Sequence, residues 1–177
     1  SYIRQIEERP FVAGGAVWSQ FNFGSEFRGD SIPHVNQKGL FTYDRKPKDI
    51  SFFYKAKFTD KPVLHIASHE WTKRVGSLTN LHPLKIYSNL PEIEIFHDGV
   101  SLGKKKVDDS RVLNLEIEFR NGWNDFRVQG NSGGTQINDE VKIHFASSAM
   151  NSGFKELSVN VGSNAQFKDL SETVWVE

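Results

Sequence analysis

The middle of the chain, from about residue 61 to residue 148, is a succession of short apolar segments separated by turn signals. Glu92-Ile-Glu-Ile-Phe96 and Val112-Leu-Asn-Leu-Glu-Ile-Glu-Phe119 alternate apolar with polar residues, which is the period of a strand with one buried face. Asp98-Gly99 supplies a hairpin turn, and Asn121-Gly122 supplies another turn. The pattern predicts an antiparallel β-sandwich of the immunoglobulin-like type. The predicted strands are 63–67, 84–87, 92–96, 102–107, 112–119, 123–128 and 141–145.

The first sixty residues have a different texture. Residues 2–9 predict the end of a helix, and the apolar run 11–18 predicts a strand buried on both faces, as in a parallel sheet. Residues 19–43 are rich in turn formers and predict a long loop, and the one-sided apolar spacing of 48–58 predicts a helix. This order is one β/α unit. Since a lone parallel strand has no neighbours here, we expect the chain to start within a domain.

The last thirty residues predict a linker followed by the beginning of another unit. Residues 146–155 are small and polar, a strand is expected from Leu157 to Val161, and the chain stops at Val174-Trp-Val-Glu177. This apolar material has no complete domain to bury it, so we expect the chain to end within a domain as well. The predicted organisation is an incomplete β/α unit (1–60), a sandwich (61–148), and a linker with the start of a further β domain (149–177).

Composition excludes several classes of function. Lys plus Arg and Asp plus Glu are both 22, so no global field attracts nucleic acid or an anionic membrane. No apolar run approaches the ~18 residues of a membrane span. The absence of Cys excludes disulfides, thiolate zinc sites and Cys nucleophiles, but it leaves the compartment open. His65 and His69 lie in strand-like surroundings that separate them, so no metal site and no cofactor is expected.

Three motifs surround the predicted long loop. Gly14-Gly-Ala-Val-Trp18 precedes it, and Asn36-Gln-Lys38-Gly39 followed by Asp44-Arg45-Lys-Pro47-Lys48 ends it. In this order they resemble the end of the catalytic (β/α)8 TIM barrel of glycoside hydrolase family 2, which includes β-galactosidases and β-glucuronidases. The sandwich resembles the immunoglobulin-like domain that follows this barrel in many bacterial members. The segment 159–175 resembles the start of a malectin-like carbohydrate-binding domain.

The resemblance implies an internal fragment of a larger retaining exo-glycosidase. Such enzymes use two carboxylates about 5 Å apart. By resemblance these are glutamates on the fourth and seventh barrel strands, which precede residue 1, so no catalytic residue is expected here and the isolated chain is expected to be inactive. Glu26 and Asp30 lie in the loop, where they either touch substrate or a cation or are simply solvated. The outward face of the sandwich is expected to carry the alternating glutamates, namely Glu92, Glu94, Glu116 and Glu118.

Trp18, Asn36 and Lys38 are the candidate substrate-binding residues. Trp18 ends the presumed barrel strand, on the face where barrel active sites form, and its indole suits the face of a sugar ring; the alternative is core packing. Asn36 and Lys38 can donate hydrogen bonds to sugar oxygens, and a matching Asn-x-Lys motif is associated in β-glucuronidases with the substrate carboxylate; the alternative is a turn Asn and a surface Lys. Asp44 and Arg45 are expected to form an ion pair or to hold the loop against the helix.

The leading functional hypothesis is therefore a β-galactosidase that removes terminal β-galactose in carbohydrate breakdown. A β-glucuronidase is the alternative, for which Asn36 and Lys38 argue. A non-catalytic structural or carbohydrate-binding module is the hypothesis from a different class. The expected partners are a carbohydrate substrate and the remainder of the parent polypeptide, with no nucleic acid and no membrane. The family resemblance is compatible with a periplasmic or secreted location.

Overall fold

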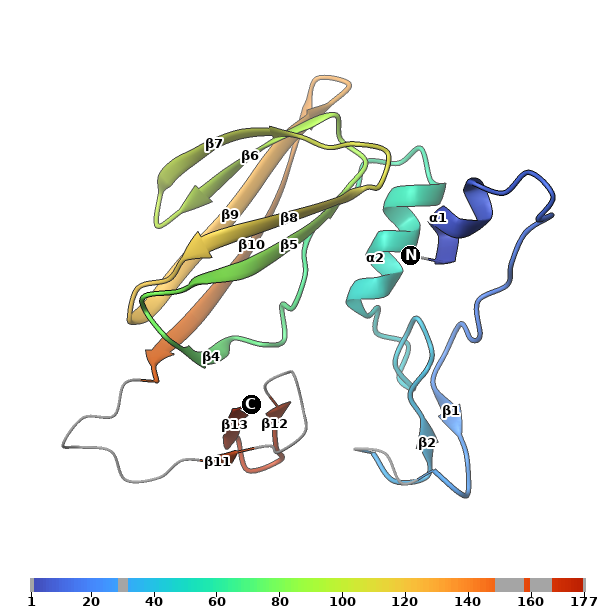
Figure 1. The fold of residues 1–177 in the computed structure, drawn as a ribbon, viewed down its shortest axis with the longest axis horizontal. Helices are drawn as coiled ribbons and strands as arrows, with labels where there is room; N and C mark the ends of the chain where they lie inside the picture. The colour runs from blue at the N-terminus through green and yellow to red at the C-terminus, as the bar shows by residue number, and fades with distance from the viewer. Residues whose placement is uncertain (1, 29–31, 149–157, 160–166, 177) are drawn as a thin grey trace.

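The structure is a computed structural model, and it describes residues 2–28, 32–148, 158–159 and 167–176 (Figure 1). A β-sandwich forms the largest part. Two helices and a small β-ribbon lie on its N-terminal side, and a small three-stranded sheet follows it. The mainly β fold predicted from the sequence is confirmed.

The sandwich consists of a five-stranded sheet and a three-stranded sheet. The first has the order β4-β10-β9-β6-β7 and the second the order β3-β5-β8. Every pair in them is antiparallel except β10 with β4, which is parallel. The strands are β3 (Leu64–Ile66), β4 (Lys73–Gly76), β5 (Leu81–Ser88), β6 (Glu92–His97), β7 (Val100–Lys106), β8 (Val112–Glu118), β9 (Gly122–Ser132) and β10 (Thr135–Ser147).

The core lies between the two sheets. Because successive residues of a strand point to opposite faces, every second residue enters it. Thus Ile93 and Ile95 are buried on β6, while Glu92 and Glu94 stay on the outer face, as predicted. The side chains that are almost fully buried come from both sheets and include Ile66, Leu84, Ile86, Ile93, Ile95, Phe126, Val128, Ile143 and Phe145.

One hairpin turn lies where the sequence predicts it, and a second joins two strands that are longer than predicted. Asp98 (φ 51°) and Gly99 (φ 81°) join β6 to β7 at the predicted turn, with the positive φ angles of a two-residue hairpin. Gly133 (φ 54°) and Gly134 (φ 83°) join β9 to β10, so these strands are longer than predicted. Residues 129–140 carry few apolar residues, and hydrogen bonding rather than burial forms this extension.

The N-terminal part contains helix α1 (Tyr2–Glu7), strands β1 (Phe23–Gly24) and β2 (Val35–Asn36), and helix α2 (Asp49–Phe58). The predicted helix over 48–58 is confirmed. The strand predicted over 11–18 is wrong, because these residues have no strand structure and are mostly exposed. A strand needs a hydrogen-bonded neighbour, and no other described segment of this chain pairs with residues 11–18.

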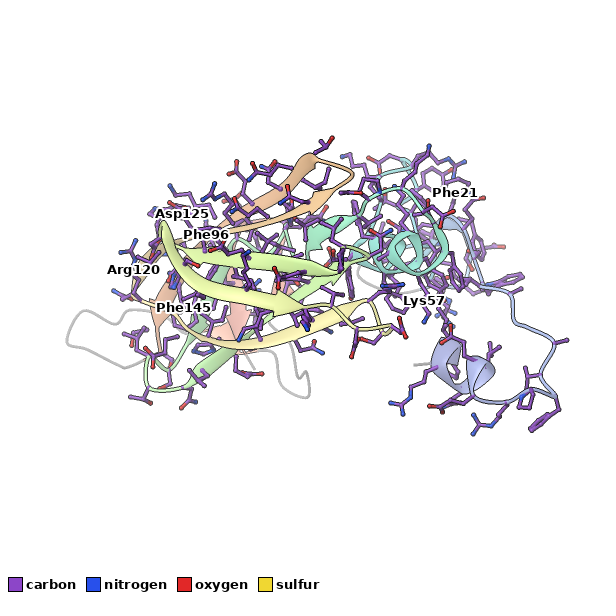
Figure 2. The ribbon with its side chains drawn as sticks, turned by 90° about the horizontal axis from the view of Figure 1, so that it is seen from above. Phe21, Lys57, Phe96, Arg120, Asp125 and Phe145 are labelled. Atoms are coloured by element: carbon purple, nitrogen blue, oxygen red, sulfur yellow. The ribbon has the colours of Figure 1, made fainter. Side chains whose placement is uncertain are left out.

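Helix α2 packs on the sandwich through one face. Phe53 and Ala56 are buried there, and the Phe53 ring lies 5.7 Å from the Tyr87 ring of β5. Lys57 Nζ donates to the carbonyl oxygen of Asp109 at 2.8 Å and pairs with Glu7 of α1 at 3.0 Å, between the two helices and the sandwich (Figure 2). The apolar face predicted for this helix is only partly covered, since Phe58 is 66% exposed.

The C-terminal sheet contains β11 (Ser158–Val159), β12 (Phe167–Lys168) and β13 (Val174–Val176) in the order β11-β13-β12. Lys73 of β4 pairs with Glu172 at 3.3 Å and ties this sheet to the sandwich. β11 falls within the strand predicted from Leu157 to Val161. Most of the predicted linker lies outside the described residues.

Candidate functional site

The loop that carries the predicted site is closed by backbone pairing between its two ends. Leu40 N donates to Ser19 O at 3.0 Å, and Phe41 N donates to Gln20 O at 2.9 Å. Further in, β1 and β2 form a short antiparallel ribbon in which Phe23 is the partner of Asn36. The segment that begins at Trp18 therefore runs beside the segment that contains Asn36 and Lys38.

Trp18 lies at the surface. Its side chain is 73% exposed, and its ring meets the ring of Phe23 edge to face at 6.2 Å. Because Phe23 pairs with Asn36, the indole lies against the small ribbon that contains Asn36. Within the residues that the structure describes, the indole is exposed rather than packed in a core, and its role in binding stays a prediction.

Asn36 is buried, with 7% exposure, and its Oδ1 accepts a hydrogen bond from Lys38 N at 3.1 Å. This is the local turn that the alternative interpretation expected. Among the described residues, nothing accepts a hydrogen bond from its amide nitrogen. The turn therefore fixes the orientation of the amide and leaves a donor for an incoming oxygen.

Lys38 follows this turn and is exposed. No carboxylate in the described part of the chain pairs with its ammonium group. The sequence proposes Trp18, Asn36 and Lys38 as one set of binding residues, and the structure places the backbone segments that carry them side by side.

Asn22 of this loop and Lys48, which follows it, were not identified from the sequence as part of the site. Lys48, which precedes α2, reaches back with Nζ to Asn22 Oδ1 at 2.7 Å and to the carbonyl oxygen of Gln37 at 2.6 Å. Burial lowers the pKa of Lys48. Lys48 ends the third sequence motif, Asp44-Arg45-Lys-Pro47-Lys48, and that motif was the signal that could have identified it.

The acidic and basic residues near the loop have other partners than expected. Asp44 pairs with Lys46 at 3.0 Å rather than with Arg45, because the turn from Thr42 to Lys46 points Arg45 the other way. The Arg45 guanidinium lies 3.9 Å from the centre of the Phe21 ring. Glu26 is exposed, as a solvated loop acid would be, and Asp30 lies outside the described residues.

A second group of polar side chains, which the sequence pattern does not reveal, lies where α2 meets the sandwich. His65 and His69 stack at 4.8 Å between ring centres, and both face Asp139 of β10. Asp139 Oδ2 accepts from Ile66 N at 2.7 Å and lies 2.9 Å from His69 Nε2, and His65 Nε2 lies 2.8 Å from Asp49 Oδ1. The expectation that the two histidines lie apart is wrong, because the chain between them folds back on itself.

Among the described residues, His65, His69 and Asp139 have the side-chain types of a metal site, and their donor atoms lie within 4.8 Å of one another. The two imidazole planes are nearly parallel, at 20°, so their in-plane nitrogen lone pairs do not converge on one point. Hydrogen bonds already engage the carboxylate and both rings. We name this group of Asp49, His65, His69 and Asp139 the junction cluster.

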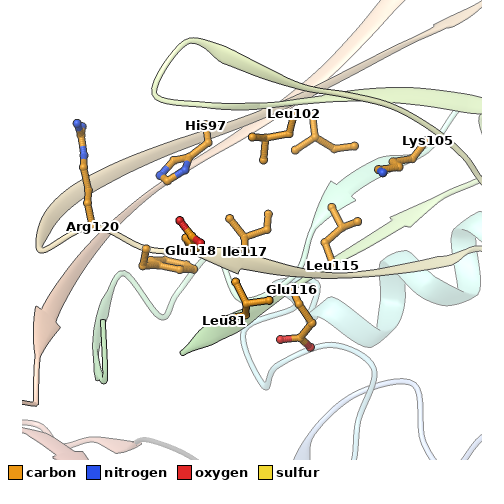
Figure 3. A pocket seen from close by; sticks show the side chains of 11 residues that line it. Leu81, His97, Leu102, Lys105, Leu115, Glu116, Ile117, Glu118 and Arg120 are labelled. Carbon is orange, nitrogen blue, oxygen red and sulfur yellow. The ribbon is translucent and has the colours of Figure 1, made fainter. Parts of the chain in front are cut away.

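An open groove of about 590 Å³ lies between β7 and β8, where the two sheets part. Figure 3 shows Leu102 of β7 opposite Leu115 and Ile117 of β8, with Arg120 and Glu118 towards one end. Its floor is apolar and its rim carries both signs of charge. None of the three predicted site residues lines it.

Comparison with known proteins places the chain in a family. A family model described as "Domain of unknown function (DUF4982)" matches residues 80–138. The chain is 37% identical over 145 residues to a β-glucuronidase of Bacteroides fragilis and 28% identical over 119 residues to the β-galactosidase BoGH2A of Bacteroides ovatus. The crystal structure of a Bacteroides uniformis β-glucuronidase matches 99% of the chain at 38% identity, with a TM-score of 0.85. The chain belongs to glycoside hydrolase family 2.

The family 2 relatives are much longer than this chain. The alignment with the B. fragilis protein covers 79% of this chain but 20% of that protein. The alignment with the B. ovatus protein covers 67% of this chain and 13% of that protein, and the B. uniformis structure is matched over 22% of its length. The similarity to these relatives confirms the resemblance to family 2 that the sequence motifs and the sandwich suggested. Neither helix that the structure describes is long and apolar enough to cross a membrane.

Proposed function

We propose that the protein containing this chain hydrolyses terminal β-glucuronides with retention of configuration, and that the chain supplies one wall of the pocket for the terminal sugar. The observation that carries the proposal is the Asn36-Gln-Lys38 turn. It presents an amide donor and an exposed ammonium group with no carboxylate partner among the described residues. A carboxylate on the sugar satisfies both groups.

Each residue has a distinct role in this proposal. The accessible face of Trp18 stacks on the apolar face of the sugar ring. The Asn36 amide donates to one sugar oxygen from an orientation that the Lys38 backbone fixes. The Lys38 ammonium pairs with the carboxylate of the substrate, and such a hydrogen bond to a charged group contributes about 1.5–3 kcal/mol.

The chemical step needs a general acid/base and a nucleophile, two carboxylates about 5 Å apart on either side of the scissile bond. In this proposal the remainder of the parent polypeptide contributes both, and this chain contributes binding groups only. The isolated chain is therefore expected to hydrolyse neither β-glucuronides nor β-galactosides.

The preference for glucuronides over galactosides departs from the leading hypothesis drawn from the sequence. The relatives at 37% and 38% identity are named β-glucuronidases, and the β-galactosidase is 28% identical. A positive side chain without a counter-ion also has more to gain from an acidic sugar than from galactose. A β-galactosidase remains the second candidate, favoured by the similarity to BoGH2A.

The test uses the full-length enzyme and chromogenic β-glucuronide and β-galactoside. We expect Lys38→Ala to lower kcat/KM for the glucuronide about tenfold to 100-fold, the kinetic equivalent of a lost charge-assisted hydrogen bond, and to leave the galactoside value within about threefold. Lys46→Ala is the matched control, because Lys46 is an exposed lysine that pairs with Asp44. Equal losses on both substrates, or a parent enzyme that prefers the galactoside, would contradict the proposal.

A further inference from the structure

The third sequence motif, which ends in Lys48, has no role in the proposed function, and the contacts of Lys48 suggest one. Its side chain is partly buried and crosses from the start of α2 to the loop. Its Nζ donates to Gln37 O at 2.6 Å, and Gln37 is the residue between Asn36 and Lys38. The backbone of Lys48 also donates to Leu40 O at 3.0 Å. Lys48 is therefore hydrogen-bonded directly to the Asn36-Gln-Lys38 turn.

Asn22 forms the remaining hydrogen bond between Lys48 and the loop. It is 4% exposed, and its Oδ1 accepts from both Lys48 Nζ at 2.7 Å and Gly39 N at 3.1 Å. Its backbone N donates to Phe41 O at 2.9 Å, so Asn22 is itself fixed by the pairing of the loop ends. One amide oxygen thus ties the ammonium of Lys48 to the residue that follows Lys38.

Gly39 is required by this arrangement. A Cβ at position 39 would lie 2.2 Å from Asn22 N, a separation that no side chain can adopt. The close approach brings Gly39 N within hydrogen-bonding distance of Asn22 Oδ1. We call Asn22, Gly39 and Lys48 the loop clasp.

The loop clasp fixes the backbone on both sides of Lys38. Gln37 is held through its carbonyl oxygen and Gly39 through its N–H, while Lys38 N is held by Asn36 Oδ1. A turn held at three successive residues keeps its shape when the ligand arrives, and a preorganised site loses less conformational entropy on binding. The clasp leaves the Lys38 side chain pointing to solvent.

We propose that Lys48 is a positioning residue for the Asn36-Gln-Lys38 turn, acting through Gln37 and Asn22 rather than by contact with the sugar. This inference rests on the proposed function, because it assumes that the turn binds the sugar. It assigns a role to the motif Asp44-Arg45-Lys-Pro47-Lys48. Its terminal lysine is the long cationic side chain that reaches two loop oxygens from the helix side.

The experiment compares Lys48→Met with the Lys46→Met control in the full-length enzyme. Methionine keeps an unbranched apolar side chain and removes the ammonium group. We expect the KM for the glucuronide to rise about tenfold to 100-fold, since a displacement of ~1 Å in a binding group can cost about 100-fold, while kcat changes less than about threefold. Lys46→Met is expected to match the unaltered enzyme. Thermal unfolding of each variant checks that the protein is folded.

A double-mutant cycle with Lys38→Ala tests whether Lys48 acts through the turn. In the Lys38→Ala background, Lys48→Met is expected to change the KM for the glucuronide less than about threefold, because the ammonium group, the charged member of the turn that Lys48 positions, is gone. Asn22→Ala removes the acceptor shared by the clasp and is expected to reproduce the Lys48→Met kinetics. It also serves as the test if Lys48→Met does not fold.

Each remaining outcome overturns one of the two proposals. If Lys48→Met raises KM equally with and without Lys38, or lowers kcat at constant KM, Lys48 does not act through the turn and the inference fails. Unchanged kinetics in both Lys48→Met and Asn22→Ala overturn it as well. If instead Lys38→Ala alone shows no selective loss on the glucuronide, the proposed function fails, whatever the behaviour of Lys48.

Discussion

The carboxylate of Asp139 joins three parts of the molecule, so its removal is a sharp test of the described packing. It lies on β10, accepts from Ile66 N of β3 at 2.7 Å, and faces His69 at 2.9 Å. Asp139→Ala deletes both interactions. Because Ile66 is fully buried, its backbone N–H would be left without a partner and without ready access to water.

The expected loss follows from these two contributions. A buried N–H without an acceptor costs about 1–3 kcal/mol, and a hydrogen bond involving a charged group contributes about 1.5–3 kcal/mol. The side chain of Asp139 keeps 20% exposure, so water can partly replace it, and the lower part of each range applies. We therefore expect Asp139→Ala to lower the free energy of unfolding by about 3 kcal/mol at pH 6. Asp139→Asn retains an acceptor for Ile66 and is expected to lose about 1 kcal/mol.

The loss is expected to depend on pH. The hydrogen bond with Asp139 raises the pKa of His69 above its ordinary 6.5, against the effect of burial. Burial raises the pKa of Asp139, but the hydrogen bonds from His69 and Ile66 outweigh it and hold the pKa below 3.8. Because the pKa of His69 is raised on folding, its contribution to the stability of the fold is complete below pH 6.5 and is lost as the pH rises through the pKa of the folded state. Because the pKa of Asp139 is lowered on folding, its contribution is complete above pH 3.8 and is lost as the pH falls through the pKa of the folded state. The interaction between His69 and Asp139 therefore stabilises the fold most between pH 3.8 and pH 6.5.

Urea unfolding of this chain, followed by tryptophan fluorescence at pH 6 and pH 9, measures the effect. Asp125→Ala is the control, because Asp125 is 57% exposed and its carboxylate pairs with Lys142 at the surface. Such a pair contributes about 1 kcal/mol or less. A loss below about 1 kcal/mol for Asp139→Ala, or an equal loss at both pH values, would refute the reasoning.

Three further predictions concern the core, a turn and the indole. Phe126→Ala removes a ring that is 1% exposed and is expected to cost about 3–5 kcal/mol in urea unfolding. Gly99→Ala forces a side chain into φ 81° and is expected to cost about 1 kcal/mol by the same measurement. Trp18→Ala is expected to change the stability of this chain by less than about 0.5 kcal/mol, because the ring is 73% exposed. In the full-length enzyme it is expected to raise KM for glucuronide and galactoside alike, since an uncharged indole does not distinguish them.

The sequence predicts the sandwich well wherever burial dictates the residue type. β6 and β8 alternate apolar and charged residues because one face of each meets the core. β4 (Lys73–Gly76) was missed, since it lies at the sheet edge with every residue partly or fully exposed and its pairing with β10 is set by backbone hydrogen bonds. The strand expected over 11–18 fails for the opposite reason, because it has the apolar residues but no strand partner in the described part of the chain.

The sequence proposes three candidate site residues, whose role in binding stays a prediction, but it does not predict how they are arranged. Trp18, Asn36 and Lys38 were found through motif order, whereas the buried role of Asn22 depends on a backbone approach at Gly39 that no local pattern encodes. The junction cluster depends on contacts between residues some seventy positions apart, such as His69 with Asp139. A spacing rule applied to the two histidines alone cannot detect a partner on another strand.

The parallel pairing of β4 with β10 has a consequence for how the chain acquires its fold. It aligns Lys73 with His144, while β9 and β10 are joined by a tight turn. Contacts between distant residues form slowly, because a long loop must first close. During synthesis β4 emerges well before β10, its strand partner, so this edge of the five-stranded sheet stays unpaired until about residue 147 has left the ribosome. The C-terminal strand of the sandwich thus sets when the domain can close, and a chain interrupted ahead of it exposes Ile66 and Phe126 to other unfolded chains.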